Sequence, residues 1–143
     1  MKKTFWVPKI EFKHFGRGIF QFKNRKPIKL LKGGHGQSNI NYLIKNKLSF
    51  FIKNKLPNGV RVGSISCHKR KSERAGGHLW FPAKWSDETI KNAGLHVANL
   101  KRNKEVANHK HMKGRFRGVD VIATKRGRKI TGIFPNKDML NKE

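Results

Sequence analysis

Histidines are the side chains of this 143-residue sequence best suited to acid–base chemistry. Two of the seven have suggestive neighbours: His35 lies in the glycine-rich residues 33–36, and His68 opens a run of lysines and arginines. Glycines allow the backbone and an imidazole to approach a ligand closely, and an imidazole exchanges protons near neutral pH. One imidazole as base, a second as acid and a lysine near the phosphate would suffice to cleave RNA through its own 2′-hydroxyl. Such a reaction needs no metal and leaves a 2′,3′-cyclic phosphate.

These residues also have simpler interpretations. A histidine is more often structural than catalytic, and residues 68–74 are typical of a solvated loop that binds phosphate. His109 and His111 have a spacing that could bind a metal, yet no carboxylate or thiol cluster lies beside them, which favours a surface loop. The sequence has no P-loop, no CxxC pair and no acidic pair of the kind that glycosidases use. We therefore expect no resident metal and no required cofactor.

Charge is the strongest compositional signal. Thirty-four Lys and Arg residues against eight Asp and Glu residues give a formal net charge of +26. A folded chain with this charge repels itself, so its surface is expected to suit a polyanion. RNA or DNA is the first choice of partner and an anionic membrane the second. A single cysteine excludes a disulfide framework, and no apolar run is long enough to span a membrane.

Periodicity predicts a mixture of helices and strands, which is an α+β fold. Ser38 is expected to cap a helix with Ile40, Leu43 and Ile44 on one face, and residues 86–100 form a second helix capped by Ser86. Residues 67–77 and 101–114 are expected to be loops. Strands are expected at residues 10–12, 20–22, 48–52, 60–66, 119–123 and 129–134, with a turn at 125–128 joining the last two into a hairpin.

Three aromatic residues, Trp80, Phe81 and Trp85, precede the second helix. A place in the core is favoured for them, and stacking on nucleic-acid bases is the less favoured alternative. The basic, aromatic-rich residues 1–32 are interpreted as a β lead-in, a linker or an RNA-contacting arm. Their first apolar stretch stops at Pro8, too early for a signal peptide.

Five motifs follow one another between residues 33 and 138: GGHGQSNINYL (33–43), PNGVRVG (57–63), HKRK (68–71), WFPAKWSD (80–87) and ITGIFP (130–135). In this order they resemble the bacterial EndoU nuclease domain, a C-terminal module of polymorphic and contact-dependent inhibition toxins. The resemblance implies small antiparallel sheets with flanking helices, ending in the C-terminal β-hairpin. It also implies a nuclease domain over residues 33–138, after the lead-in 1–32 and before a tail at 139–143.

The resemblance implies roles for individual residues. His35 and His68 correspond to the general base and general acid, in either order. Lys71 or Lys69 would stabilise the scissile phosphate, with Lys71 slightly preferred. Substrate contacts are expected from Arg70, Arg74, His78, Thr131 and Phe134.

Two departures from the family pattern affect the base pocket. Gly132 stands where relatives are expected to have threonine, and Thr131 is one place early. His78 and Leu79 stand where relatives usually have a small polar residue, which makes His78 a third imidazole near the site.

The resemblance implies an endoribonuclease toxin that cuts single-stranded or tRNA-loop RNA near uridines. Its partners would be RNA, including tRNA, and an acidic immunity protein that covers the basic groove. Such a toxin would be secreted or delivered into the cytoplasm of a target cell. Stimulation by Mn²⁺ stays open. The alternative hypotheses are a non-enzymatic RNA-binding or ribosome-associated protein and a metal-dependent DNA nuclease.

Overall fold

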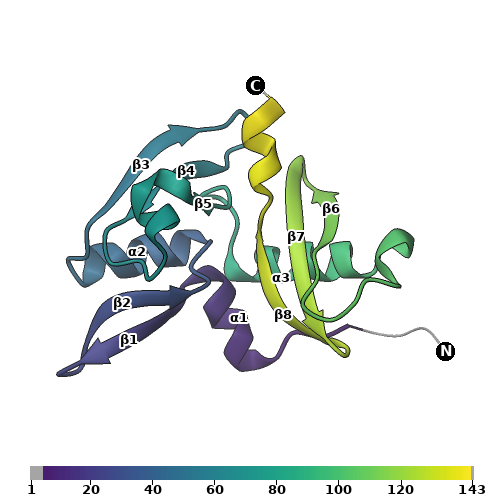
Figure 1. Ribbon diagram of the computed structural model, residues 1–143, viewed down its shortest axis with the longest axis horizontal. Coiled ribbons are helices and arrows are strands. Elements are labelled where there is room, and N and C mark those ends of the chain that lie inside the picture. Colours follow the sequence, from purple (N-terminus) through teal and green to yellow (C-terminus); the bar gives the residue numbers. More distant parts are fainter. Residues whose placement is uncertain (1–4, 143) are drawn as a thin grey trace.

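The computed structural model describes residues 5–142, so the first four residues of the expected lead-in and the last residue of the expected tail lie outside it. Helices and short strands alternate along the chain (Figure 1). In chain order the elements are α1 (Lys9–Gly16), β1 (Ile19–Lys23), β2 (Lys26–Lys32), α2 (Gln37–Lys45), β3 (Phe50–Lys55), β4 (Arg61–Ile65), η1 (Glu73–Gly77), β5 (His78–Trp80), α3 (Asp87–Ala98), η2 (Lys101–Asn103), β6 (Met112–Phe116), β7 (Val119–Arg126), β8 (Lys129–Pro135) and η3 (Lys137–Lys142).

The strands of the described chain form three small antiparallel sheets. β1 and β2 form a hairpin, β3-β4-β5 form a second sheet, and β6-β7-β8 form a third. The predicted α+β class and the predicted C-terminal hairpin, which is β7 and β8, are both confirmed. No helix within residues 5–142 is long and apolar enough to cross a membrane.

Helix α3 forms as its sequence predicts. The Ser86 side chain accepts a hydrogen bond from the backbone N–H of Thr89 at 3.2 Å, which satisfies one of the free donors at the helix start. Ile90, Ala93 and Val97 are fully buried in the larger core, which α3 shares with the β6-β7-β8 sheet. The apolar stripe of this helix therefore fastens the C-terminal sheet to the rest of the chain.

A smaller core lies between the β1–β2 hairpin, α2 and the β4–β5 pair. Leu30, Leu43, Ile65 and Trp80 are fully buried there. Phe81, next in sequence after Trp80, is buried in the larger core instead. The aromatic residues before α3 thus join the two cores, and base stacking by these residues, the less favoured alternative, is wrong.

Three local predictions are corrected. Residues 10–12 lie in helix α1, not in a strand, and the helix buries Phe15 in the larger core. Helix α2 begins at Gln37 with Gly36 as its cap, whereas the Ser38 hydroxyl donates a hydrogen bond to the Asp87 carboxylate at 2.9 Å. Ile44, expected on the apolar face of that helix, is exposed.

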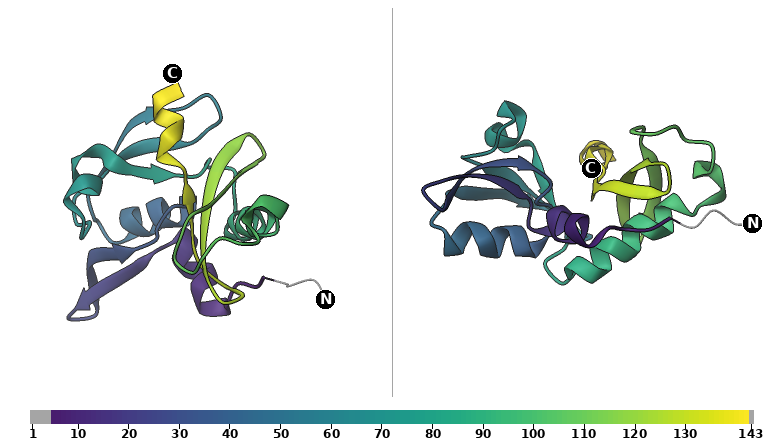
Figure 2. Two further views of the ribbon diagram at one scale, coloured as in Figure 1. Left: turned by 45° about the vertical axis from the view of Figure 1, so that its right-hand side comes forward. Right: turned by 90° about the horizontal axis from the view of Figure 1, so that it is seen from below.

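Other boundaries shift by a few residues. The predicted strand at 20–22 lies in β1, and the strand expected at 48–52 is β3, which runs to Lys55. The region 101–114, expected to be a loop, contains η2 and the beginning of β6. Helix α1 lies between α2 and α3 along one side of the molecule, and the sheets stand on the other side (Figure 2).

Candidate active site

A pocket of about 500 Å³ lies between the two halves of the fold. One wall comes from the segments that carry the candidate histidines, and the opposite wall comes from strands β7 and β8 with the residues that follow them. Helix α1 contributes a third side through Glu11, His14 and Phe15. The pocket thus depends on contacts between β5 and β8 and between α1 and β8.

Close backbone packing places His35 in this pocket. Gly33 and Gly34 have φ angles of +72° and +77°, a left-handed conformation that favours glycine. A Cβ at Gly33 would lie 2.1 Å from the carbonyl oxygen of His14, so no larger side chain fits. The His35 N–H donates to the Phe15 carbonyl at 2.9 Å, and the His35 carbonyl accepts from the Phe81 N–H at 2.6 Å. Helix α1 and the residue that follows β5 together therefore hold the backbone of His35 in position.

The hydrogen bonds of His35 determine its tautomer. Its Nδ1 lies 2.8 Å from the Leu79 carbonyl oxygen, and a carbonyl oxygen can only accept. Nδ1 therefore carries the proton, and Nε2 of the neutral ring has a free lone pair. Burial lowers the pKa of His35 to about 4, so the ring is neutral at pH 7. A neutral imidazole with a free nitrogen is suited to accept a proton.

His68 has the opposite tautomer. Its Nδ1 accepts the backbone N–H of Arg70 at 3.0 Å, so the neutral ring carries its proton on Nε2. Burial lowers the pKa of His68, the nearby Glu73 carboxylate partly opposes that effect, and Arg70 and Arg74 add to it. The two imidazoles therefore differ in which nitrogen bears hydrogen, although both are neutral in the free protein.

His78 lies between these two rings and is completely buried. Its ring stacks on His35 with centroids 4.8 Å apart and planes 5° from parallel, and its centroid is 5.4 Å from that of His68. Nε2 lies 2.8 Å from the Gly34 carbonyl oxygen, so it carries the proton. Nδ1 has no hydrogen-bond partner among the described residues. Burial, with the neighbouring His35 next in importance, holds the pKa of His78 well below its ordinary value. The third imidazole noted in the sequence is thus a neutral ring at the centre of the cluster.

The lysines chosen from the sequence do not line the pocket. Lys69 and Lys71 are exposed on the loop after His68 and lie outside it. Lys137, which follows β8, lines the pocket instead and forms an ion pair of 3.0 Å with Glu73. Its charge lowers the pKa of all three clustered histidines, though less than burial does. Of the two arginines chosen, Arg70 lines the pocket and Arg74 does not.

Glu73 is a carboxylate whose charge acts on His35 and His68 of this cluster. It is almost fully buried and accepts hydrogen bonds from the hydroxyl of Ser72 and from Lys137. Burial opposes its ionisation, but the two hydrogen bonds together with nearby positive charge, chiefly that of Lys137, outweigh that effect and lower the pKa of Glu73. An ionised carboxylate therefore balances part of the positive charge beside His68.

The C-terminal wall contains the two residues chosen from its strand. Thr131 and Phe134 both line the pocket, and the Phe134 ring centroid is 5.9 Å from that of His35. The Thr131 hydroxyl forms a hydrogen bond of 3.0 Å with the hydroxyl of Thr124 on β7. These side chains form a surface of one aromatic ring and two hydroxyls opposite the histidines.

Sequence reasoning assigned His111 to a surface loop. The structure places it at the pocket, with its ring 5.5 Å from that of Phe134. Lys113 on β6 lines the pocket beside it. Their alternation with Met112, which is buried, is the signal that could have assigned both residues to one face of a strand. Within residues 5–142, no three His, Cys, Asp or Glu side chains are grouped to hold a metal ion.

A match to a family sequence model assigns this fold and pocket to a known family. Residues 11–139 match the sequence model of the bacterial EndoU nuclease, and this match covers nearly the whole chain. Comparisons with curated proteins and with solved structures give no match.

The chain therefore belongs to the bacterial EndoU nuclease family, as its motifs predict. The match includes α1 from its third residue, the β1–β2 hairpin and every segment that lines the pocket.

Proposed function

We propose that this protein is an endoribonuclease that cleaves RNA by attack of a ribose 2′-hydroxyl on the adjacent phosphate. The observation that carries the proposal is the pair of opposite tautomers in one pocket, with a free Nε2 on His35 and a proton on Nε2 of His68. Membership of a nuclease family and the net charge of +26 support it independently.

In this mechanism His35 is the general base. Its Nε2 accepts the proton of the 2′-hydroxyl while O2′ forms a bond to phosphorus. The bond from phosphorus to the 5′-oxygen breaks, and the products are a 2′,3′-cyclic phosphate and a 5′-hydroxyl. The lowered pKa of His35 keeps the base unprotonated at neutral pH.

His68 is the general acid. A phosphate bound beside an imidazole favours the charged form of that imidazole, so the bound RNA would protonate His68 by drawing in a solvent proton. Nε2 of the charged ring then donates its proton to the departing 5′-oxygen. Each of these proton transfers is worth about 10²–10⁴-fold in rate.

The phosphate charge needs a cation in the pocket. Lys71 and Lys69 are the choices that follow from the family resemblance, but they lie outside the pocket. Of the basic side chains that line it, Lys137 and Arg70 are those whose charges act on His68. We assign the main role to Lys137, whose partial exposure leaves it able to exchange Glu73 for a phosphate oxygen. Phe134 and Thr131 would contact the base on the 5′ side, for which uridine is proposed.

The test uses two short single-stranded RNAs of mixed sequence with one uridine, identical except for a 2′-deoxyuridine in the second. Both are incubated in EDTA and again with Mn²⁺, and product ends are identified by mass spectrometry. Cleavage of the first RNA only, with a 2′,3′-cyclic end, is expected. RNA that is bound but stays intact under both conditions would mean a non-enzymatic RNA-binding protein. Cleavage of a DNA oligomer of the same sequence, added as a third substrate with Mn²⁺, would mean a metal-dependent nuclease that does not use the 2′-hydroxyl.

We also propose a toxin role, because the motifs resemble those of toxin modules that are delivered into the cytoplasm of target cells. The expected partner is an acidic immunity protein, since a carboxylate-rich surface would complement the basic groove. Co-expression with the neighbouring reading frame should protect cells and yield a complex. Growth arrest that the neighbouring gene does not relieve would contradict the pairing.

A further inference from the structure

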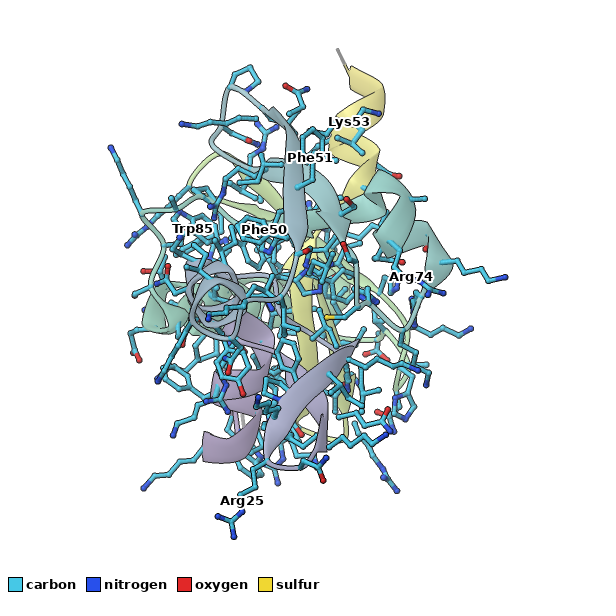
Figure 3. The ribbon with its side chains drawn as sticks, turned by 90° about the vertical axis from the view of Figure 1, so that its left-hand side faces the viewer. Arg25, Phe50, Phe51, Lys53, Arg74 and Trp85 are labelled. Atoms are coloured by element: carbon cyan, nitrogen blue, oxygen red, sulfur yellow. The ribbon has the colours of Figure 1, made fainter. Side chains whose placement is uncertain are left out.

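The β1–β2 hairpin is a second strongly basic feature, and its turn lies outside the catalytic pocket. Residues 19–32 contain five Lys or Arg residues and no Asp or Glu. Lys23, Arg25 and Lys26 cluster at its turn and are all exposed. The hairpin extends away from the body of the molecule (Figure 2), and Arg25 points outward from its end (Figure 3). This charge is available to a partner because no carboxylate within the hairpin offsets it.

Apolar surface accompanies the charge. The side chain of Phe22 is 54% exposed and that of Ile28 is 40% exposed. Phe22 pairs with Pro27 across the hairpin, so its ring lies one register position from the basic turn. Lysines and arginines beside an exposed aromatic ring are the combination that binds single-stranded nucleic acid, since the cations contact phosphates and the ring stacks on bases.

The hairpin leads directly into the catalytic pocket. Leu30 of β2 forms a parallel bridge with His68, through hydrogen bonds of 3.0 Å from the Leu30 N–H to Cys67 and 2.8 Å from the Lys69 N–H to Leu30. Further along β2, Leu31 and Lys32 line the pocket itself. The basic loop 68–74 therefore runs beside β2, and its one carboxylate, Glu73, is buried and paired with Lys137.

We infer that the β1–β2 hairpin and the adjoining loop 68–74 form a binding track for the RNA strand that flanks the cleavage site. Strand β2 has seven residues, which at about 3.3 Å per residue span roughly 23 Å. A stacked strand advances about 3.4 Å per nucleotide, so the track accommodates on the order of six nucleotides. This inference rests on the proposed function, because it assigns the substrate of that site as a single strand longer than the scissile dinucleotide.

The test measures binding and cleavage separately. Binding is measured by fluorescence anisotropy with a 2′-O-methyl RNA 12-mer, which has no 2′-hydroxyl to attack. The hairpin variant is K23Q/R25Q/K26Q. The matched control is K84Q/K101Q/K104Q, which removes the same charge from exposed positions outside the hairpin and the loop.

The hairpin variant should bind the 12-mer more than tenfold more weakly than the control does. Its slope of log affinity against log salt should fall by about 2, since each single-strand phosphate contact contributes about 0.7. F22S should weaken binding about fivefold or more without changing that slope, because it removes stacking and no charge. Equal affinities and slopes for the hairpin and control variants would overturn the inference.

Cleavage gives a second readout that separates the two proposals. We compare kcat/KM for an all-RNA 12-mer with kcat/KM for the trinucleotide at its cut site. The ratio of the first value to the second should fall at least tenfold in the hairpin variant and stay at the wild-type value in the control. A wild-type protein that cuts neither RNA contradicts the proposed function, while the binding data still decide the hairpin.

Discussion

Acid should destabilise this protein well before its carboxylates titrate. His35, His68 and His78 all have lowered pKa values, chiefly because they are buried. Between the ordinary histidine pKa and these lowered values, the unfolded chain binds protons that the folded protein does not. The free energy of unfolding therefore falls as the pH falls through this range.

The size of this loss in the free energy of unfolding can be worked out for His35 alone. A pKa of about 4 in the folded protein against 6.5 in the unfolded chain corresponds to a loss of about 2 kcal/mol between pH 7.5 and pH 5. His68 and His78 add to this loss in the same direction. Glu73 also has a lowered pKa, but its contribution is lost only below its ordinary value of 4.5, outside this interval.

The perturbation that isolates His35 is H35N. The asparagine amide can still donate to the Leu79 carbonyl, as Nδ1 does now, but it does not titrate. Urea unfolding, followed by tryptophan fluorescence to which the buried Trp80 and Trp85 contribute, gives the free energy of unfolding at pH 7.5 and pH 5. The variant should lose about 2 kcal/mol less than the wild type does between these two conditions.

H109N is the matched control, since it removes an exposed imidazole from the turn before β6. If wild type and H35N lose the same free energy of unfolding between pH 7.5 and pH 5, the reasoning is refuted, because His35 would then be protonated equally in the folded and unfolded chains. A difference of the opposite sign would mean that the folded protein stabilises the charged ring.

Other predictions concern the cation of the site and the packing around it. K137M should lower kcat/KM for RNA about 10²-fold, whereas K71M, at an exposed position outside the pocket, should lower it far less; equal losses would return the phosphate role to the loop after His68. N39A removes the buried acceptor of the Trp80 indole N–H and should cost about 1–3 kcal/mol in urea unfolding, and no loss would argue against that bond. G94A places a Cβ 2.2 Å from an Ile133 methyl group and should cost about 1–3 kcal/mol, unless that side chain moves freely.

Much of the fold was predictable because its signals are local. The Ser86 cap and the apolar spacing after it lie within one helix, and the β7–β8 hairpin has alternating residues on both sides of a glycine-containing turn. Helix α1 was missed because a short apolar run is compatible with either a helix or a strand. Its last carbonyls accept the N–H groups of Gly34 and His35, and such distant hydrogen bonds leave no local pattern.

The site residues also divide into those with a local sequence signal and those that only distant contacts bring to the pocket. His35 and His68 could be chosen because unusual neighbours flank each of them in the sequence. Lys137 and His111 lie more than 40 residues beyond His68, and only the pairing of β6, β7 and β8 brings them to the pocket. The family resemblance favoured Lys69 and Lys71, but both side chains are exposed outside the pocket, while Arg70 between them lines it.

The two walls of the pocket come from distant parts of the chain, and this has a consequence for biosynthesis. His35 emerges from the ribosome early, whereas Phe134 and Lys137, which face it, are translated about 100 residues later. A nascent chain therefore carries all three clustered imidazoles past the ribosome's own RNA without the wall that would hold a substrate against them. A fragment ending before β7 should be inert, and cleavage should return only when it assembles with a separate peptide that contains β7, β8 and Lys137.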